Sequence, residues 1–456
     1  SIRQPVIRKI YSPGPPDWLC TLGRMTDYAN ELTPEREAER TEVLDKARAA
    51  KQVAATFAQL TTPRKNEILE QAAQDLIDNT AAILEANKQD LEAGKERGLS
   101  ESLLDRLALD EDRVAGIADG LRQVAGLQDP VGQILEGKNM DNGIQMRKVR
   151  VPLGVMGMVY EARPNVTVDA FGLALKSGNV PLLRGSKSAR KSNEKLVEIL
   201  QNTLEKFDLP REGVQLLPCE TRDSVQDLIT ARGLVDLVIP RGGAGLINAV
   251  VKGATVPAIE TGTGNCHFYI DGSADIDKAI DMVGNGKTRR TSVCNSTECV
   301  LLDAALADDV KLRIVKQLQD AGVTIHGDVS ELEGFGVEGA VEATEEEWEQ
   351  EFLSMDICAK VVDGVDGAIA HIGKYSTGHT EAIAAQDADV LVKFGNEVDA
   401  AAVMLNASTA FTDGEVYGMG AEIGISTQKL HARGPMALPE LTSYKWILQG
   451  TGQTRP

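Results

Sequence analysis

The sequence of 456 residues is poor in aromatic side chains and histidines and has no surplus of positive charge. Aromatic residues make up 4% of it, and 68 acidic residues outnumber 48 basic ones, for a formal net charge of -20. A chain this acidic repels nucleic-acid phosphates and anionic bilayers, so neither is an expected partner. No apolar run reaches the ~18 residues of a membrane-spanning helix. These absences favour a soluble metabolic enzyme or a soluble binding protein.

Cysteine is also scarce, and the few cysteines follow no regular spacing. They stand at positions 20, 219, 266, 294, 299 and 358, without a CxxC pair. A chain of this size needs no disulfides, so we expect reduced thiols and a cytoplasmic location. Cys266 and His267 could join Cys294 and Cys299 as metal ligands, but zinc spacing is absent. We therefore expect no metal site.

The first 24 residues differ from the rest of the chain. They are basic and proline-rich, and they lack the apolar stretch of a signal peptide. Met25 resembles a natural start. We expect residues 1–24 to be a disordered extension.

Apolar spacing predicts a helical region followed by alternating strands and helices. Helical periodicity runs from Leu44 to about Leu127, with Thr62 expected as a helix cap and Pro63 in the first turn. Strands are then predicted at 145–151, 153–159, 180–183, 214–217, 234–239 and 255–259. The intervening helices are predicted at 166–176, 187–207, 224–231 and 244–251. This alternation predicts a doubly wound parallel sheet that binds ligands at the carboxyl ends of its strands.

A second α/β unit is predicted from His267 to about Asn406. The acidic run 345–351 inside it is typical of a solvated helix start. The strand 441–448 has no local partner in the sequence. We expect it, like strand 145–151, to be able to complete a sheet in a neighbouring subunit.

Two nucleotide-binding motifs are nearly present. Residues 334–339 fit GxGxxG, but no strand leads into them and glutamates surround them. Residues 286–288 resemble the end of a P-loop, but Asp281 occupies the position that requires glycine. Kinase and NTPase functions are therefore disfavoured.

Cys294 is the best candidate for a nucleophile. Three cations, Lys287, Arg289 and Arg290, precede it in a Ser/Thr-rich turn, a setting expected to lower the pKa of the thiol. The alternative is a buried, inert thiol.

Two further polar segments follow strand ends. Asn165 stands where a buried strand gives way to a helix, so its amide could donate to an oxyanion or serve as a cap. Between Arg184 and Lys195 there are five cations and one acid, Glu194. This segment could bind an anionic cofactor at a helix amino end, or it could be a solvated helix face.

Together these segments resemble the γ-glutamyl phosphate reductases of the aldehyde dehydrogenase superfamily. The resemblance extends from Met25 to Trp446 and is carried by EARPNVT at 161–167, KTRRTSVCN at 287–295, IPRGGAGL at 239–246, ETGTGNCH at 260–267, AHIGKYSTGHTE at 370–381, NAST at 406–409 and STQKLHARGPM at 426–436. It implies an NADP-binding domain (25–134 and 152–262), a catalytic domain (263–425) and a small β oligomerisation element (135–151 and 426–456).

The resemblance implies the NADPH-dependent reduction of L-glutamate 5-phosphate to L-glutamate 5-semialdehyde and phosphate, the second step of proline synthesis from glutamate. Cys294 would attack the acyl phosphate and form a thioester. The Asn165 amide and the Cys294 backbone N–H would hold the oxyanion.

The resemblance also indicates the cofactor residues. NAD-using relatives have Lys and Glu where this chain has Arg184 and Lys187, and a cation in place of the carboxylate favours NADP. Glu351 resembles the glutamate that holds the nicotinamide ribose, and Arg241, Gly242 and Gly243 resemble the loop near the nicotinamide. Glu260 matches the general base of oxidising relatives, and its role here stays open.

Substrate residues and partners follow on the same basis. The glutamyl phosphate is expected at His379, Asn406, Ser408, Thr409 and Arg433, each of which also has a structural interpretation. A homo-oligomer is expected, and a transient contact with glutamate 5-kinase is conceivable. The alternatives are a general NAD(P)-linked aldehyde dehydrogenase that uses Glu260 as base, or a catalytically silent scaffold.

Overall fold

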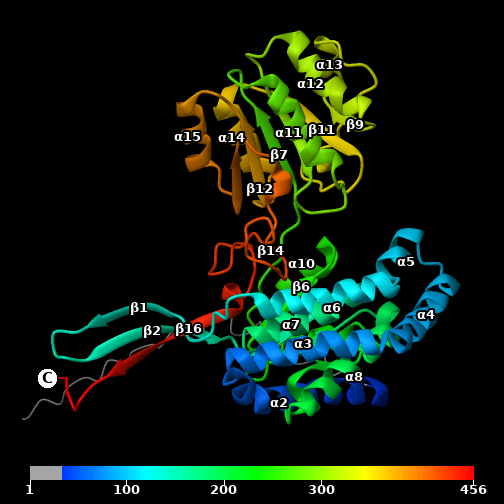
Figure 1. Cartoon of the computed structure of the whole chain (residues 1–456). Helices are drawn as coiled ribbons and strands as arrows, with labels where there is room; N and C mark the ends of the chain where they lie inside the picture. Colours follow the sequence, from blue (N-terminus) through cyan, green and yellow to red (C-terminus); the bar gives the residue numbers. More distant parts are fainter. Residues whose placement is uncertain (1–32, 456) are drawn as a thin grey trace, which may run out of the picture.

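The computed structural model describes residues 33–455 and comprises two α/β bodies and a β ribbon that projects from one of them (Figure 1). Each body contains one parallel sheet, which confirms the predicted α/β class. Within residues 33–455, no helix is long and apolar enough to cross a bilayer. The expected disorder of residues 1–24 lies outside the described residues.

The first body begins with the predicted helical region. Its helices are α2 (Pro34–Ala58), α3 (Thr62–Asp78), α4 (Thr80–Glu96), α5 (Glu101–Leu107) and α6 (Glu111–Gly126). The Thr33 hydroxyl accepts the Arg36 N–H at 3.3 Å and caps α2. The expected cap at Thr62 is wrong, because Thr62 is already inside α3 and its hydroxyl donates to Asp129 Oδ2 at 2.7 Å.

The sheet of the first body has four parallel strands. Their order is β5 (Gln215–Leu216), β4 (Val180–Arg184), β3 (Val155–Tyr160) and β6 (Leu237–Arg241). The crossover helices are α7 (Pro164–Lys176), α8 (Arg190–Lys206), α9 (Asp223–Ile229) and α10 (Ala244–Gly253). Both β3 and β4 are buried along their whole length, which explains their apolar runs.

The strand predicted at 255–259 is wrong. The segment makes only an isolated parallel bridge between Ala258 and Val238. Pro257 has no N–H, so it can accept the Val238 N–H at 2.9 Å but cannot donate to a ladder. The sheet therefore stops at β6 on this side.

The second body has a larger parallel sheet. Its order is β10 (Val341–Glu342), β9 (Thr324–Gly327), β11 (Asp356–Val362), β8 (Thr297–Asp303), β7 (Cys266–Ile270), β12 (Thr380–Ala384) and β13 (Ala402–Leu405). Its helices are α11 (Ile276–Thr288), α12 (Asp308–Asp320), α13 (Val329–Gly334), α14 (Gly364–Tyr375) and α15 (Ala388–Glu397). The acidic run does not start an α-helix, because only Glu346–Trp348 forms a single 3₁₀ turn.

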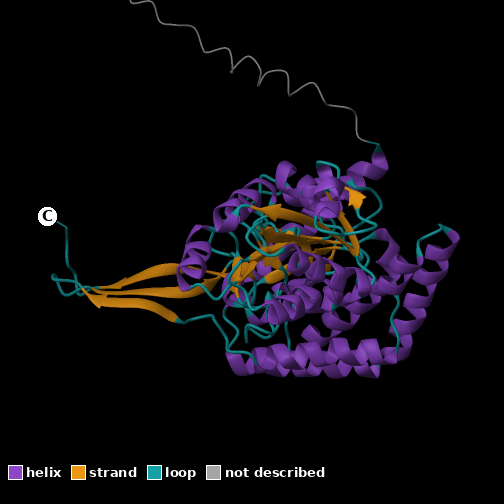
Figure 2. Cartoon of the chain, turned by 90° about the horizontal axis from the view of Figure 1, so that it is seen from above, coloured by secondary structure: helices purple, strands orange, loops and turns teal. Residues whose placement is uncertain are grey.

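The projecting ribbon consists of β1 (Ile134–Asn139), β2 (Gln145–Pro152) and β16 (Thr442–Gln449), all antiparallel (Figure 2). The last strand has no partner nearby in the sequence, but it is not left unpaired, because β16 pairs with β2 of the same chain from Thr442 to Gln449. The Lys148 ammonium lies 4.0 Å from the Tyr444 ring centre and links the two strands. Pairing on both sides of β2 makes β16 and β1 the edges of the ribbon.

Gly213 is a testable packing constraint in the first body. A methyl group there would lie 2.0 Å from Cζ of Phe57, whose ring is buried in the core. We expect Gly213→Ala to lower the free energy of unfolding by about 1–3 kcal/mol, measured as a lower urea midpoint. Gly116→Ala in α6 is the control, since its methyl group would meet no described atom within 4 Å. Equal midpoints for both variants would contradict this packing.

Candidate active site

The predicted nucleophile lies at the amino edge of the catalytic sheet. Cys294 belongs to the loop between α11 and β8, and Gly264 lies just before the neighbouring strand β7. The carboxyl edge of the first sheet, where β6 ends at Arg241, supplies the opposing residues. Arg241 is close enough to Cys294 to act on the charge of its thiol.

The backbone of Gly264 packs directly against Cys294. A Cβ at position 264 would lie 1.4 Å from the Cys294 carbonyl oxygen, so only glycine fits there. The Cys266 thiol donates to the same carbonyl at 3.3 Å. The Gly264 N–H donates to Glu351 Oε1 at 2.9 Å. These contacts bring the 260–267 motif, Cys294 and Glu351 together, as the resemblance requires.

The expected low pKa of the Cys294 thiol is wrong for this conformation. Burial, followed by the charge of Glu351, raises the pKa to about 12, and Arg241 opposes this rise. The cations before the cysteine do not act as expected. Lys287 is buried in an ion pair with Glu298 at 2.7 Å, while Arg289 and Arg290 are exposed to solvent. The thiol is therefore protonated at neutral pH, although Cys294 is partly exposed.

The loop after β6 is held by a carboxylate. Glu161 Oε1 accepts the Gly243 N–H at 3.0 Å, at the amino end of α10. A side chain at Gly242 would come within 2.7 Å of the Glu161 carboxyl carbon. Arg241 donates through Nη1 to the Ile423 carbonyl at 2.9 Å. Glu161 occurs within a motif that the sequence singled out, but its contact with this loop gave no sequence signal.

Asn165 lies in the first turn of α7, where β3 has ended. Its amide donates to Asp169 Oδ2 at 3.3 Å. Loss of hydration raises the pKa of Asp169 to about 6. The hydrogen bond from Asn165 and the charge of Arg241 oppose this rise. Arg241 is thus a common electrostatic neighbour of Asp169 and Cys294.

The two cations expected to read the cofactor differ in their surroundings. Arg184 is buried, and its guanidinium donates to Ser224 Oγ at 2.9 Å and to the carbonyls of Gly185 and Thr221. Arg184 therefore links the backbone after β4 to the backbone before α9. Lys187 is half exposed and lies 3.3 Å from Glu220 Oε2. Only Lys187 is free to turn toward a bound phosphate.

The cationic segment 184–195 is partly neutralised by its neighbours. Arg190 pairs with both Glu194 and Glu220, and Lys191 lies 3.6 Å from Glu194. The local positive charge predicted from the sequence is therefore smaller than a simple count suggests.

The expected substrate residues fall into two groups. His379 and Thr409 are buried near the amino edge of the catalytic sheet, where Cys266 Sγ is 3.9 Å from His379 Nδ1 and Thr409 Oγ1 is 2.9 Å from Thr297 Oγ1. Ser408 is buried beside them and accepts the Ala410 N–H at 3.2 Å.

The remaining two candidates are engaged elsewhere. Asn406 follows β13 at the carboxyl edge of the sheet, opposite Cys294, and both atoms of its amide bond the backbone of Ala385. Its positive φ of 57° is the left-handed conformation that asparagine tolerates in a turn. Arg433 donates to Asp399 Oδ1 at 2.8 Å. The structure does not bring Asn406 to the thiol.

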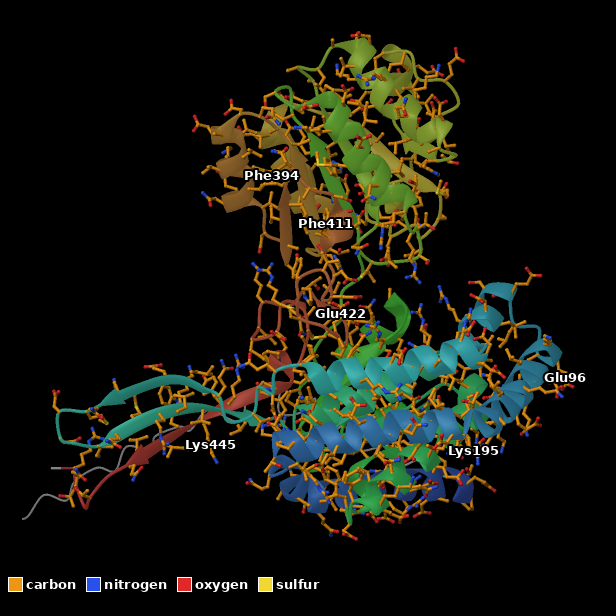
Figure 3. The ribbon with its side chains drawn as sticks, in the orientation of Figure 1. Glu96, Lys195, Phe394, Phe411, Glu422 and Lys445 are labelled. Atoms are coloured by element: carbon orange, nitrogen blue, oxygen red, sulfur yellow. The ribbon has the colours of Figure 1, made fainter. Side chains whose placement is uncertain are left out.

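Glu260 and Glu422 complete the surroundings of the site. The Glu260 N–H donates to Gln428 Oε1 at 3.0 Å, which ties the 260–267 motif to the segment after β14 (Ile425–Ser426). Glu422 lies in the segment that connects the two bodies (Figure 3) and raises the pKa of Cys294 through its charge. The sequence gave no signal for Glu422, because it lies in a glycine-rich connection without a motif.

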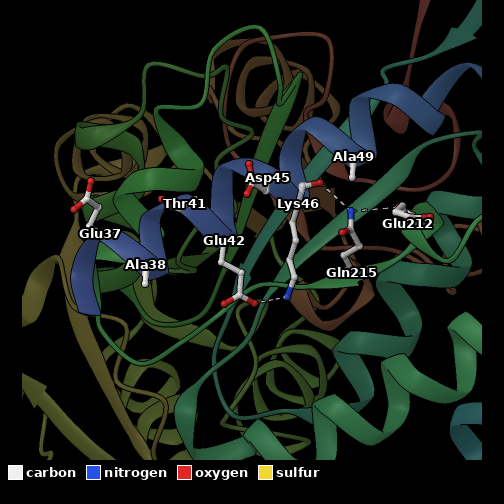
Figure 4. Close-up of a pocket in the computed structure, with 9 residues that line it drawn as sticks. All are labelled: Glu37, Ala38, Thr41, Glu42, Asp45, Lys46, Ala49, Glu212 and Gln215. Carbon is white, nitrogen blue, oxygen red and sulfur yellow. Dashed lines mark hydrogen bonds and ion pairs between the residues drawn. The ribbon is translucent and has the colours of Figure 1, made fainter. Parts of the chain in front are cut away.

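A pocket of about 660 Å³ lies elsewhere, between α2 and the chain around Glu212 and Gln215 (Figure 4). Four carboxylates and one ammonium line it, from Glu37, Glu42, Asp45, Glu212 and Lys46. An anionic cofactor or acyl phosphate would be repelled there. The candidate active site is therefore the arrangement around Cys294.

Comparison with known proteins agrees with this arrangement. The sequence matches the aldehyde dehydrogenase family over residues 29–330. The structure of γ-glutamyl phosphate reductase from Thermotoga maritima is 44% identical, with a TM-score of 0.89, and the match covers 91% of this chain and 100% of that one.

More distant structures share the fold. An acetylating aldehyde dehydrogenase from Geobacillus thermoglucosidasius is 18% identical, with a TM-score of 0.67 and coverage of 93% and 100% of the two chains. The glyceraldehyde-3-phosphate dehydrogenase GapN from Methanocaldococcus jannaschii, complexed with NADP, is 17% identical, with a TM-score of 0.65 and coverage of 91% and 95%. The chain therefore belongs to the aldehyde dehydrogenase family and, within it, to the γ-glutamyl phosphate reductases.

Proposed function

We propose that this protein reduces L-glutamate 5-phosphate to L-glutamate 5-semialdehyde and phosphate with NADPH, in the cytoplasmic synthesis of proline. The observation that carries the proposal is the 44% identity over the whole Thermotoga maritima reductase. The placement of Cys294 between Gly264, Glu351 and Arg241 supports it.

Cys294 supplies the nucleophile. Its sulfur attacks the acyl carbon, a C–S bond forms, and the C–O bond to phosphate breaks with its electron pair leaving on the phosphate. Because burial keeps the pKa of the thiol near 12, its proton must first be lost to solvent, which reaches this partly exposed residue. Arg241 already lowers that pKa, and loss of the Glu351 charge would lower it further.

The residues around the thioester stabilise charge and exclude water. The Asn165 amide and the Cys294 backbone N–H donate to the oxyanion that develops on the acyl oxygen. The Cys294 carbonyl is held by the Cys266 thiol, which orients the peptide unit between Cys294 and Asn295. The oxyanion role of Asn165 requires its amide to leave Asp169, a bond of 3.3 Å in this conformation.

The residues at the carboxyl edge of the first sheet suit a phosphorylated dinucleotide. Lys187 is half exposed beside β4 and can exchange Glu220 for a 2′-phosphate. Arg241, Gly242 and Gly243 lie at the amino end of α10, where the Gly243 N–H would exchange the Glu161 carboxylate for an anionic group of the cofactor. Glu351 accepts one N–H and has a second oxygen for a ribose hydroxyl. When bound, NADPH supplies the two electrons that reduce the acyl group.

The first prediction concerns phosphate dependence. Run backward, the wild-type enzyme should produce NADPH from L-glutamate 5-semialdehyde and NADP⁺ only when inorganic phosphate is present, because phosphate must cleave the thioester. NADPH absorbance measures this. Production that is independent of phosphate would favour a general aldehyde dehydrogenase with Glu260 as base. Equal rates with Cys294→Ala would favour a catalytically silent scaffold with a contaminating activity.

The second prediction concerns the thiol. In the absence of ligands, alkylation of Cys294 by iodoacetamide should rise about tenfold per pH unit from pH 7 to pH 10 without a plateau, because the thiolate fraction grows throughout this range below a pKa of about 12. Mass spectrometry of the Cys294 peptide measures the rate, with Cys294→Ala as background. A rate that levels off above about pH 9.5, as for a free cysteine with a pKa of ~8.5, would contradict the burial argument.

The third prediction concerns cofactor choice. Lys187→Glu should raise the KM for NADPH at least tenfold and leave the KM for NADH within about twofold, since only NADPH carries the 2′-phosphate. Lys195→Glu is the matched control, because Lys195 already pairs with Glu198 on α8 at 2.6 Å. Equal losses with both cofactors would show that Lys187 does not contact the 2′-phosphate.

A further inference from the structure

Three metal-binding side chains that the reaction does not use meet inside the second body. They are His267 on β7, Cys299 on β8 and His371 on α14, and their ligand atoms all lie within 4.8 Å of one another. All three residues are buried. They come from separate elements, which explains why the sequence shows no zinc spacing.

His267 presents an unused lone pair to this cluster. Its Nδ1 bonds Glu381 Oε2 at 3.0 Å, and the same oxygen accepts the His267 backbone N–H at 2.8 Å. The other oxygen of Glu381 accepts from the Ser376 hydroxyl. A carboxylate that only accepts places the ring proton of His267 on Nδ1, so Nε2 carries a lone pair. Nε2 is completely buried and has no hydrogen-bond partner among the described residues.

The distances are close to those of a tetrahedral zinc site. Zinc bonds of ~2.3 Å to sulfur and ~2.0 Å to nitrogen place neighbouring ligand atoms roughly 3.3–3.6 Å apart. Cys299 Sγ and His371 Nε2 are 3.8 Å apart. The other separations, which are at most 4.8 Å, require a contraction of about 1 Å. Rotation of the His371 ring, which meets the His267 ring edge to face at 5.3 Å, can supply it while Glu381 keeps the His267 ring in place.

We propose that His267, Cys299 and His371 form a binding site for a soft divalent cation of the Zn²⁺ type. The Cys299 thiolate and the Glu381 carboxylate balance the two positive charges. Glu381 also fixes the ring of His267 through Nδ1, the arrangement that orients metal-bound histidines in proteins. Thiolate and imidazole ligands exclude Mg²⁺ and Ca²⁺, which prefer oxygen.

The site is separate from the catalytic thiol. Successive residues of a strand point to opposite faces of the sheet, so Cys266 and His267 face different sides of β7. Cys266 contacts the Cys294 carbonyl and His379, whereas His267 meets His371 of α14. A cation at His267 would join β7, β8 and α14 without a ligand from Cys294.

The test uses Co²⁺ as a spectroscopic probe on the full chain, reduced and stripped of metal by a chelator. Wild type should bind one equivalent with the charge-transfer absorption of a cobalt–thiolate bond. Cys294→Ser should keep that band, because the catalytic thiol is not a ligand. Cys299→Ser should lose it, and His371→Gln should weaken binding at least tenfold. His326→Gln is the matched control, since His326 pairs with Asp356 outside the cluster.

Unfolding provides a second readout that does not involve activity. Zn²⁺ should raise the melting temperature of wild type and Cys294→Ser, because a ligand that binds the folded state stabilises it. It should not raise that of Cys299→Val, which keeps an apolar side chain in β8. If the Cys299 variants do not fold, the cobalt–thiolate bands of wild type and Cys294→Ser test the proposal. Absence of a one-to-one cobalt–thiolate band in either, or loss of the band only in Cys294→Ser, would overturn the proposal.

Discussion

The contact between the Gly264 backbone and the Cys294 carbonyl is the constraint on which the site depends. It admits no side chain at position 264, so it fixes how closely the strand β7 approaches the cysteine loop. The Gly264 N–H then orients Glu351, and Cys266, two residues further on, holds the same carbonyl from the other side. Three segments distant in the sequence are placed by one point of close packing.

Charge is distributed so that most cations are neutralised by neighbours. The chain carries a formal charge of -20, yet its reaction handles two anions. Lys287 is paired in the core, and Arg190 is bound by two glutamates. Arg241 differs from these two cations, because its Nη1 bonds a backbone carbonyl. Its charge also acts on both Asp169 and Cys294. Arg241 is therefore the cation best placed to act on the thiol.

The sequence predicted those parts of the fold that depend on local pattern. Buried strands such as β3 and β4 were found because both of their faces are apolar. Two local predictions were wrong, the strand at 255–259 and the helix cap at Thr62. Pro257 has no N–H to donate to a ladder, and the Thr62 hydroxyl bonds Asp129. Local patterns could not pair β16 with β2, because the two strands are almost three hundred residues apart in the chain. Only the resemblance placed 135–151 and 426–456 in one β element.

The site was predicted in the same measure. Cys294 and Glu351 could be named from the motifs and the resemblance that they carry, and both lie against Gly264. The pKa of Cys294 could not be predicted from the sequence. It depends on the burial of the thiol and on the ion pair between Lys287 and Glu298, and both follow from tertiary packing. The contacts of Arg184 and Asn406 with nearby backbone likewise follow from tertiary packing.

The buried pair of Lys287 and Glu298 has a mechanical consequence for the nucleophile. Lys287 lies at the end of α11 and Glu298 at the start of β8, so the pair closes the cysteine loop at its base. Joining the two ends of a loop reduces the number of conformations available to every residue between them. Cys294 therefore sits on a short, tethered segment, and the ion pair limits how far the sulfur can move during a catalytic cycle.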